Sequence, residues 1–140
     1  MRSIVGLFHS LALKGRNRSL GKGSTSSLGK RGEVEASRYL QRKGYQILET
    51  NYRALRGEID IIARKRKEIA FVEVKSGRSR DFGPPLEKVD ARKQKQIAKV
   101  ALAYLQSNSL EEVPCRFDVL SVTEEKGSIK IEHIEDAFQV

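Results

Sequence analysis

The sequence has one cysteine, no tryptophan and few aromatic residues, and it contains no long apolar run. Because Cys115 has no second cysteine to join, an internal disulfide and a cysteine-based zinc site are excluded, which fits a reducing cytoplasm. No apolar run approaches the roughly 18 residues of a membrane-spanning helix, so we expect no membrane span. With 140 residues, the chain is long enough for one domain with a hydrophobic core.

Acidic residues are absent from the first 32 positions. This stretch holds seven basic side chains, so only two of the nine net positive charges of the chain belong to residues 33–140. The high net charge is therefore weak evidence for a basic binding face on the rest of the chain. We expect residues 1–27 to form a flexible basic arm that attracts phosphate nonspecifically, ahead of a domain over residues 28–140. An amphipathic surface helix and a targeting presequence are the alternatives for the arm.

Two strand-like runs in the middle of the chain carry charged side chains. Residues 58–63 and 68–75 alternate with the period of two that is typical of strands. The four polar residues between these runs suit the connection of a hairpin. In such a hairpin Asp60, Glu73 and Lys75 lie on one face of the sheet.

Two registers are compatible with this hairpin. If Ala63 and Glu68 are the first pair after the turn, Asp60 lies opposite Phe71 and diagonal to Glu73, within about 7–8 Å at the backbone. A shift of two residues puts Asp60 directly opposite Glu73. Either register brings the two carboxylates together.

Converging carboxylates repel each other unless a cation lies between them, and hard oxygen ligands suit Mg²⁺ or Mn²⁺. Lys75 points to the same side, where its ammonium would contact a phosphate or orient water for attack on phosphorus. The alternative is that Asp60, Glu73 and Lys75 form the solvated face of an ordinary hairpin.

A helix is predicted ahead of the hairpin. Residues 28–43 have helical periodicity, and Gly44 is a typical C-terminal stop. Glu33 shares a stripe with Ala36 and Leu40 that faces inward, so we expect Glu33 to point toward the strands. Its alternative role is that of a favourable acid near the N-terminus of the helix.

The remaining elements follow from the same patterns. Residues 45–52 form a strand before the hairpin, and Asp90 caps a second helix that runs to about Ser107. Residues 116–123 and 128–134 form two more strands. The order helix, three strands, helix, two strands predicts an α/β fold with a mixed central sheet flanked by helices.

Two polar residues of the last strands are interpreted as structural. Asp118 lies in a strand whose two faces are largely apolar, so the strand is expected in the interior of the sheet and Asp118 in structural hydrogen bonds. His133 has no second histidine nearby and is expected to be a surface or packing residue.

The order of several motifs resembles the YraN family of uncharacterised bacterial proteins. These motifs are GEVEA, NYRALRGEIDIIA, FVEVKSGRS, KQKQIAKVALAYL, RFDVLSV and HIEDAF, which together cover about residue 28 to the end. That family resembles the PD-(D/E)XK, or restriction-endonuclease-like, nucleases and the archaeal Holliday-junction resolvases. The resemblance implies a restriction-endonuclease-like core and a catalytic metal site, with Asp60 and Glu73 binding Mg²⁺ or Mn²⁺, Glu33 joining through water, and Lys75 acting in catalysis.

The resemblance also extends to residues around the hairpin. Such nucleases place a Lys or Gln of the second helix near the site, which makes Gln94 a candidate catalytic residue and Lys93 a candidate nucleic-acid contact. The alternative is a solvated helix end. Arg78 and Arg80 follow Lys75 in a stretch rich in Gly, Pro and Ser, where they would hold phosphates or serve solubility. Junction-cutting nucleases act as dimers, so a homodimer is expected by analogy.

These observations predict a Mg²⁺-dependent phosphodiesterase that acts on DNA, including branched or structured DNA. The first alternative is a nucleic-acid-binding module that retains the nuclease fold without cleaving. The second is an interaction protein that uses the basic arm on membranes or partners.

Overall fold

The computed structural model describes residues 27–78 and 89–140, and the structural statements below refer to these residues. The predicted basic arm, apart from its last residue, and Arg80 lie outside them. The elements are α2 (Ser27–Arg42), β1 (Gln46–Ala54), β2 (Gly57–Lys65), β3 (Glu68–Arg78), α3 (Ala91–Ser107), β4 (Cys115–Glu125) and β5 (Ser128–Phe138). This order confirms the predicted α/β fold. Neither described helix is long and apolar enough to cross a membrane.

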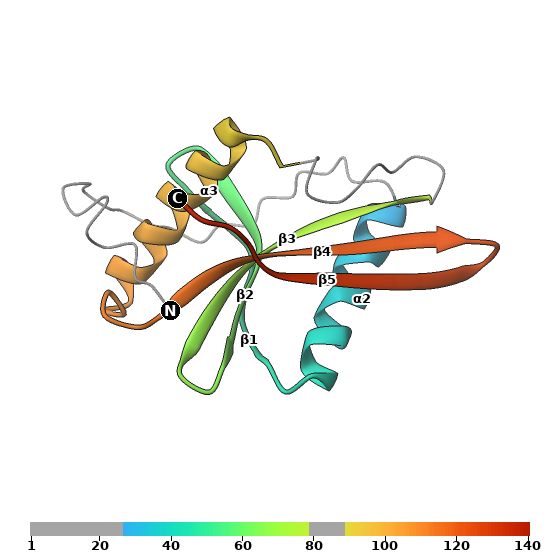
Figure 1. Cartoon of the computed structure of the whole chain (residues 1–140), viewed down its shortest axis with the longest axis horizontal. Coiled ribbons are helices and arrows are strands. Elements are labelled where there is room, and N and C mark those ends of the chain that lie inside the picture. Colours follow the sequence, from blue (N-terminus) through green and yellow to red (C-terminus); the bar gives the residue numbers. More distant parts are fainter. Residues whose placement is uncertain (1–26, 79–88) are drawn as a thin grey trace.

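The five strands form one mixed sheet in the order β1-β2-β3-β4-β5. The β3–β4 pair is parallel and the other three pairs are antiparallel. A parallel pair needs a long crossover, and α3 lies within the crossover between β3 and β4. The strands fan out from the centre of Figure 1, which shows the strong twist of the sheet. The mixed central sheet flanked by helices is therefore as the sequence predicted.

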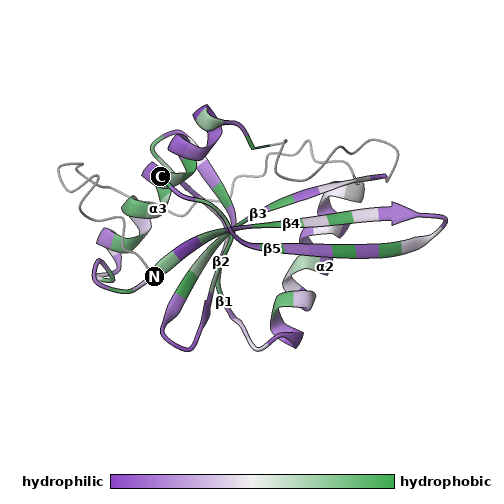
Figure 2. Ribbon diagram, viewed as in Figure 1, coloured by the Kyte–Doolittle hydropathy of each residue, from purple (hydrophilic) through white to green (hydrophobic). Residues whose placement is uncertain are grey.

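Each face of the sheet is covered by one helix, and the two helices lie on opposite sides of the strands (Figure 1). On one face α3 packs Ile97, Ala101 and Leu105 into an apolar cluster with residues of the sheet. On the other face Ala36 and Leu40 of α2 pack into a second cluster. The alternating colours along β5 in Figure 2 are those of an edge strand with one covered face. β4 is buried on both faces, which confirms that it is an interior strand.

The ends of both helices follow the predicted signals. Gly44, with φ of +96°, lies just past the C-terminus of α2, where the left-handed conformation is typical. Asp90 is the N-cap of α3, and its Oδ1 accepts a hydrogen bond of 2.9 Å from the backbone N–H of Lys93. The Asp90 cap fixes where α3 begins, and thereby which side chains of α3 face the sheet.

The β2–β3 hairpin has the second of the two predicted registers. Lys65 pairs with Glu68 and Ile61 with Val72, so residues 66–67 alone form the turn. The predicted four-residue connection was wrong because charged residues 64 and 65 continue the strand instead of leaving it. The first turn residue has φ of +58°, as two-residue hairpin turns require.

β1 also continues farther than the sequence predicted. The strand was predicted over residues 45–52, but pairing with β2 runs on to Ala54 and Gly57. Asn51 has φ of +51°, a conformation that asparagine tolerates better than most residues. The β1–β2 hairpin therefore extends beyond Ile61, the last residue of β2 that pairs with β3.

Candidate functional site

The candidate site lies where β2 and β3 part. Their pairing ends at Ile61 and Val72, while β3 continues alongside β4 to Arg78. At the first position beyond the ladder, Asp60 Oδ2 accepts a hydrogen bond of 2.7 Å from the backbone N–H of Val74. A carboxylate thus replaces the strand that would otherwise pair with this amide. The separation of the strands also gives the Asp60 side chain room to face Glu73.

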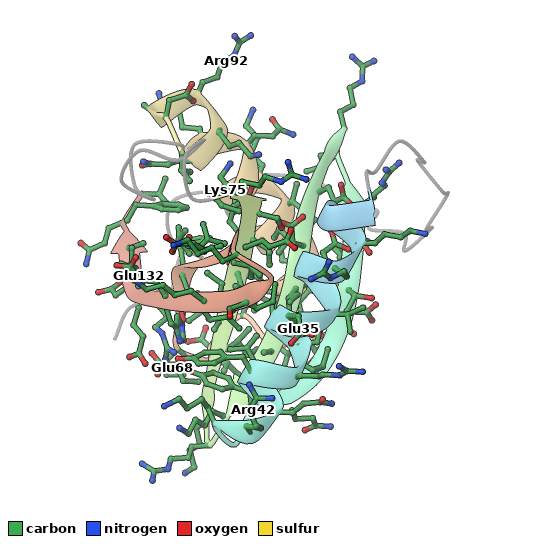
Figure 3. The ribbon with its side chains drawn as sticks, turned by 90° about the vertical axis from the view of Figure 1, so that its right-hand side faces the viewer. Glu35, Arg42, Glu68, Lys75, Arg92 and Glu132 are labelled. Atoms are coloured by element: carbon green, nitrogen blue, oxygen red, sulfur yellow. The ribbon has the colours of Figure 1, made fainter. Side chains whose placement is uncertain are left out.

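Glu73 is a buried carboxylate held by two ammonium groups. Its side chain is 8% exposed, and its Oε2 lies 2.8 Å from Lys93 Nζ and 3.7 Å from Lys75 Nζ. Lys75 comes from the same strand, whereas Lys93 comes from the first turn of α3. Buried carboxylates are stable only with such partners. Figure 3 shows Lys75 below the start of α3 and Arg92 extending away from the molecule.

Asp60 lies in an electrostatically unfavourable environment. Burial raises the pKa of its carboxyl well above the usual value, and the neighbouring charge of Glu73 raises the pKa further. The hydrogen bond from Val74 N–H lowers the pKa, while Glu33 and Glu58 add smaller upward contributions. A cation bound between Asp60 and Glu73 would relieve both the burial and the repulsion.

Glu33 projects from α2 and is hydrogen-bonded to Asn51 of β1. Both of its carboxylate oxygens accept long hydrogen bonds of 3.4 Å from the Asn51 side-chain amide. Its charge reaches Asp60, since it contributes to the raised pKa of that group. Among the described residues, however, no three acidic, histidine or cysteine side chains come close enough to one another to hold a metal. Direct ligation by Asp60 and Glu73, with Glu33 acting through water, remains the prediction.

A cleft of about 460 Å³ opens at the two carboxylates. One side is formed by the end of the β1–β2 hairpin and the other by the first turns of α3. The lining residues are Gly57, Glu58, Asp60, Glu73, Asp90, Arg92, Lys93, Gln96 and Ile97. The cleft therefore combines the buried acids Asp60 and Glu73 with an edge that carries both basic and acidic side chains, where a metal and a phosphate could bind together.

The structure brings some of the predicted residues to the cleft and leaves others aside. Lys93 lines it, but Gln94 does not, because the Gln94 amide donates a hydrogen bond of 2.9 Å to Val89 O. Arg78 is exposed at the end of β3. Gln96, which the sequence analysis missed, lines the cleft.

Helical spacing offered two candidates on α3, Lys93 and Gln94, for the residue that faces the cleft. Ile97 faces the sheet, and stepping back three residues selects Gln94 whereas stepping back four selects Lys93. The second step is the correct one for the cleft. Gln96, adjacent to Ile97, lies on the border of the buried face.

A second polar cluster surrounds Asp118, and both carboxylate oxygens of Asp118 are hydrogen-bonded within the fold. The Asp118 carboxylate binds Arg116 Nε at 2.9 Å, His133 Nε2 at 2.8 Å and the backbone N–H of Asp136 at 3.0 Å. Arg116 also donates to Glu68 Oε1 at 2.6 Å. Burial alone would raise the pKa of Asp118, but these hydrogen bonds outweigh it and hold the pKa below the usual value. The structural role predicted for Asp118 is confirmed.

The fold and the cleft define the class of protein: an α/β protein whose mixed sheet opens into a cleft lined by acidic residues and by Arg92 and Lys93. Sequence comparison identifies the family within that class. Residues 32–122 match the profile described as "Uncharacterised protein family UPF0102", and the chain belongs to this family. UPF0102 is another name for the YraN family, so the family predicted from the motifs is confirmed.

Relatives of known sequence match over most of their length. A UPF0102 protein from Geotalea uraniireducens is 44% identical over 124 residues, covering 88% of this chain and 98% of the relative. One from Syntrophus aciditrophicus is 49% identical over 112 residues, covering 80% and 88%. One from Trichlorobacter lovleyi is 48% identical over 123 residues, covering 86% and 96%.

Proposed function

We propose that this protein is a metal-dependent phosphodiesterase that cleaves DNA, with branched or structured DNA as a substrate. The observation that carries the proposal is that Asp60 and Glu73, just beyond the last β2–β3 pair, line one cleft together with Lys93 and Arg92. Burial and the charge of Glu73 raise the pKa of Asp60, so a divalent cation between the two carboxylates is favoured, and basic side chains beside them favour a phosphate.

The residues at the site fit Mg²⁺ or Mn²⁺. Asp60 and Glu73 would supply carboxylate oxygens, and Glu33 would join through water. In a strand the N–H and C=O of one residue project to the same edge, so the Val74 carbonyl also faces the side on which its N–H meets Asp60. When bound, the cation would polarise a phosphoryl oxygen and neutralise charge that develops on it.

The two lysines would divide the remaining tasks. Lys75, whose side chain is 20% exposed, is confined beside Glu73 and would orient the attacking water. Lys93, 44% exposed, has room to leave Glu73 and hold a substrate phosphate. Their ammonium groups would also stabilise the negative charge of the pentacoordinate phosphorus.

Purified protein tests this proposal on labelled single-stranded, duplex, flapped and four-way DNA, with Mg²⁺, Mn²⁺ or EDTA. We expect cleavage that requires the metal and falls at least about 100-fold in Asp60→Asn, Glu73→Gln and Lys75→Met. The matched control is Glu35→Gln, because Glu35 lies on α2 and pairs with Arg38 outside the cleft. Cleavage that persists in Glu73→Gln would identify a contaminating nuclease and contradict the proposal.

A nucleic-acid-binding module without cleavage is the second candidate. The observation that favours it is the 2.8 Å contact between Lys93 and Glu73, which already neutralises one of the two carboxylates. This function predicts salt-sensitive binding that needs no metal and is unchanged by Asp60→Asn. Sedimentation of the same protein, with and without DNA, tests the homodimer expected by analogy with junction-cutting nucleases.

A further inference from the structure

The turn between β1 and β2 holds two large side chains in an unfavourable backbone conformation. Ala54 pairs with Gly57, and the two residues between them, Leu55 and Arg56, have φ of +50° and +64°. A two-residue turn with both φ values positive favours Asn-Gly. Leucine and arginine are disfavoured in this left-handed region, because Cβ lies too close to the following carbonyl oxygen. Leu55 is also 39% exposed, so burial does not account for its presence.

This strained turn is fixed against α3. Gln96 Nε2 donates a hydrogen bond of 2.8 Å to Leu55 O. Gly57 approaches the helix so closely that an added Cβ would lie 2.7 Å from Val100 Cγ2. Arg53 and Glu58 form a cross-strand ion pair at 3.8 Å behind the turn. Strain that the surrounding contacts maintain is typical of functional positions.

The turn is continuous with the candidate active site. A shallow hollow of about 450 Å³ is lined by residues 53–58, and it shares Gly57 and Glu58 with the cleft that holds Asp60 and Glu73. Arg53 and Glu58 on the hollow are paired with each other, so Arg56 supplies the positive charge at the start of the path from the turn to the carboxylates. A substrate strand bound along this path would pass Leu55 before it reaches Asp60.

We propose that this turn recognises the branch point of branched DNA, with Leu55 packing on a base that has lost its stacking partner and Arg56 holding the adjacent phosphate. The inference rests on the proposed nuclease function and names the substrate that the site would take. An apolar wedge has to unstack bases in an intact duplex, and this unstacking costs least where a strand already leaves the duplex. An exposed leucine on a turn that is fixed against α3, beside Arg56, therefore selects an interrupted duplex over a continuous one.

Leu55→Asn separates recognition from a structural role. Asparagine suits the left-handed region, so the variant is expected to unfold a few degrees higher than wild type. At the same time, the ratio of its affinities for four-way DNA and continuous duplex, measured by fluorescence anisotropy in EDTA, should fall at least about 5-fold. Val34→Asn is the control, because Val34 is 50% exposed on α2 and should not change the ratio.

The outcomes distinguish this inference from the proposed function. A wild-type protein that cleaves DNA without preferring branched forms, or a Leu55→Asn variant that keeps the preference, overturns the inference alone. Binding that depends on Leu55 without metal-dependent cleavage supports the inference and overturns the nuclease. A wild-type protein that binds no DNA overturns both.

Discussion

At the scale of single residues, Asp60 shows that the site is built at the expense of stability. Its folded pKa is raised by burial and by Glu73, so the folded chain binds a proton more tightly at this carboxyl than the unfolded chain does. The contribution of Asp60 to the free energy of unfolding therefore falls as pH rises above the ordinary value of about 3.8. At neutral pH the ionised Asp60 destabilises the metal-free protein.

Asp60→Asn should consequently stabilise the protein while removing the candidate site. Its side-chain oxygen can still accept the Val74 N–H, and the gain at pH 8 in EDTA should be on the order of 1 kcal/mol. The gain should disappear below about pH 4. Thermal unfolding across this pH range measures it, with Glu35→Gln as the control. Added Mg²⁺ should raise the melting temperature of wild type but not of Asp60→Asn; equal shifts would contradict the metal site.

Asp118 has the opposite linkage, because its pKa is lowered by His133, Arg116 and the Asp136 N–H despite burial. It stabilises the fold above the ordinary aspartate pKa, and this contribution is lost as pH falls through the lowered value. Asp118→Asn should cost roughly 3–5 kcal/mol at pH 7, since Arg116 and His133 would lose a buried charged partner.

Urea unfolding at pH 7 and at lower pH tests this linkage. The difference between wild type and Asp118→Asn should narrow as pH falls below about 3.8. The control is Glu124→Gln, which removes an exposed pair with Arg31 at 3.9 Å and should cost less than about 1 kcal/mol. A cost for Asp118→Asn no larger than for the control would show that the buried cluster contributes little.

The sequence predicted which residues converge better than it predicted which contacts they make. Asp60, Glu73 and Lys75 could be placed together because alternation along a strand is a local property. The contact of Lys93 with Glu73 could not, because it depends on how α3 is rotated above the sheet. Lys93 and Gln94 differ by about a quarter turn of helix, and local pattern alone does not resolve that rotation.

At the scale of elements, α2 depends on a glycine for its position on the sheet. A Cβ added at Gly32 would lie 2.0 Å from Ser76 Oγ and 2.8 Å from Ser76 Cβ on β3. Gly32 therefore allows α2 to approach β3 closely, and it sets the distance from which the next residue, Glu33, reaches the site.

Gly32→Ala should destabilise the protein by about 1–3 kcal/mol through overpacking, which exceeds the gain of about 1 kcal/mol from better helix propensity. Adding Ser76→Gly should restore much of the loss, since it removes the atoms that clash. Urea unfolding of both variants and of Ser76→Gly alone gives the coupling between the two positions. Additive costs would show that Gly32 is not required for close packing.

The elements themselves were predictable, but their connections were less so. Helix ends at Gly44 and Asp90 carry standard signals, and both were predicted correctly. The two-residue turn after Lys65 was not, because charged residues inside a strand resemble a loop in sequence. The turn at Leu55 carries no typical turn residue in its two central positions, so nothing local indicated it.

At the scale of the whole molecule, positive charge is concentrated outside the described part of the chain. The first 26 residues hold five basic side chains and no acid. We expect them to add affinity for DNA without selecting its structure, since phosphate contacts carry little sequence or shape information.

A chain that begins at Ser27 should therefore bind DNA more weakly and with a shallower dependence on salt, each lost phosphate contact lowering the slope by about 0.9. Metal-dependent cleavage and the preference for branched DNA should remain. Anisotropy titrations at several salt concentrations measure the slope. Melting temperature serves as the control for folding. An unchanged slope would show that these residues do not contact DNA.

The bond between Asp60 and the Val74 amide gives the protein an internal spectroscopic probe. This amide donates to a carboxylate at 2.7 Å, so its proton resonance should respond to any charge that arrives at that carboxylate. A cation titration followed by ¹⁵N-resolved NMR would report occupancy through one backbone signal, without substrate, turnover or a mutated side chain. The amide of Ile69, which bonds to Pro114 O instead, supplies an unaffected reference in the same spectrum.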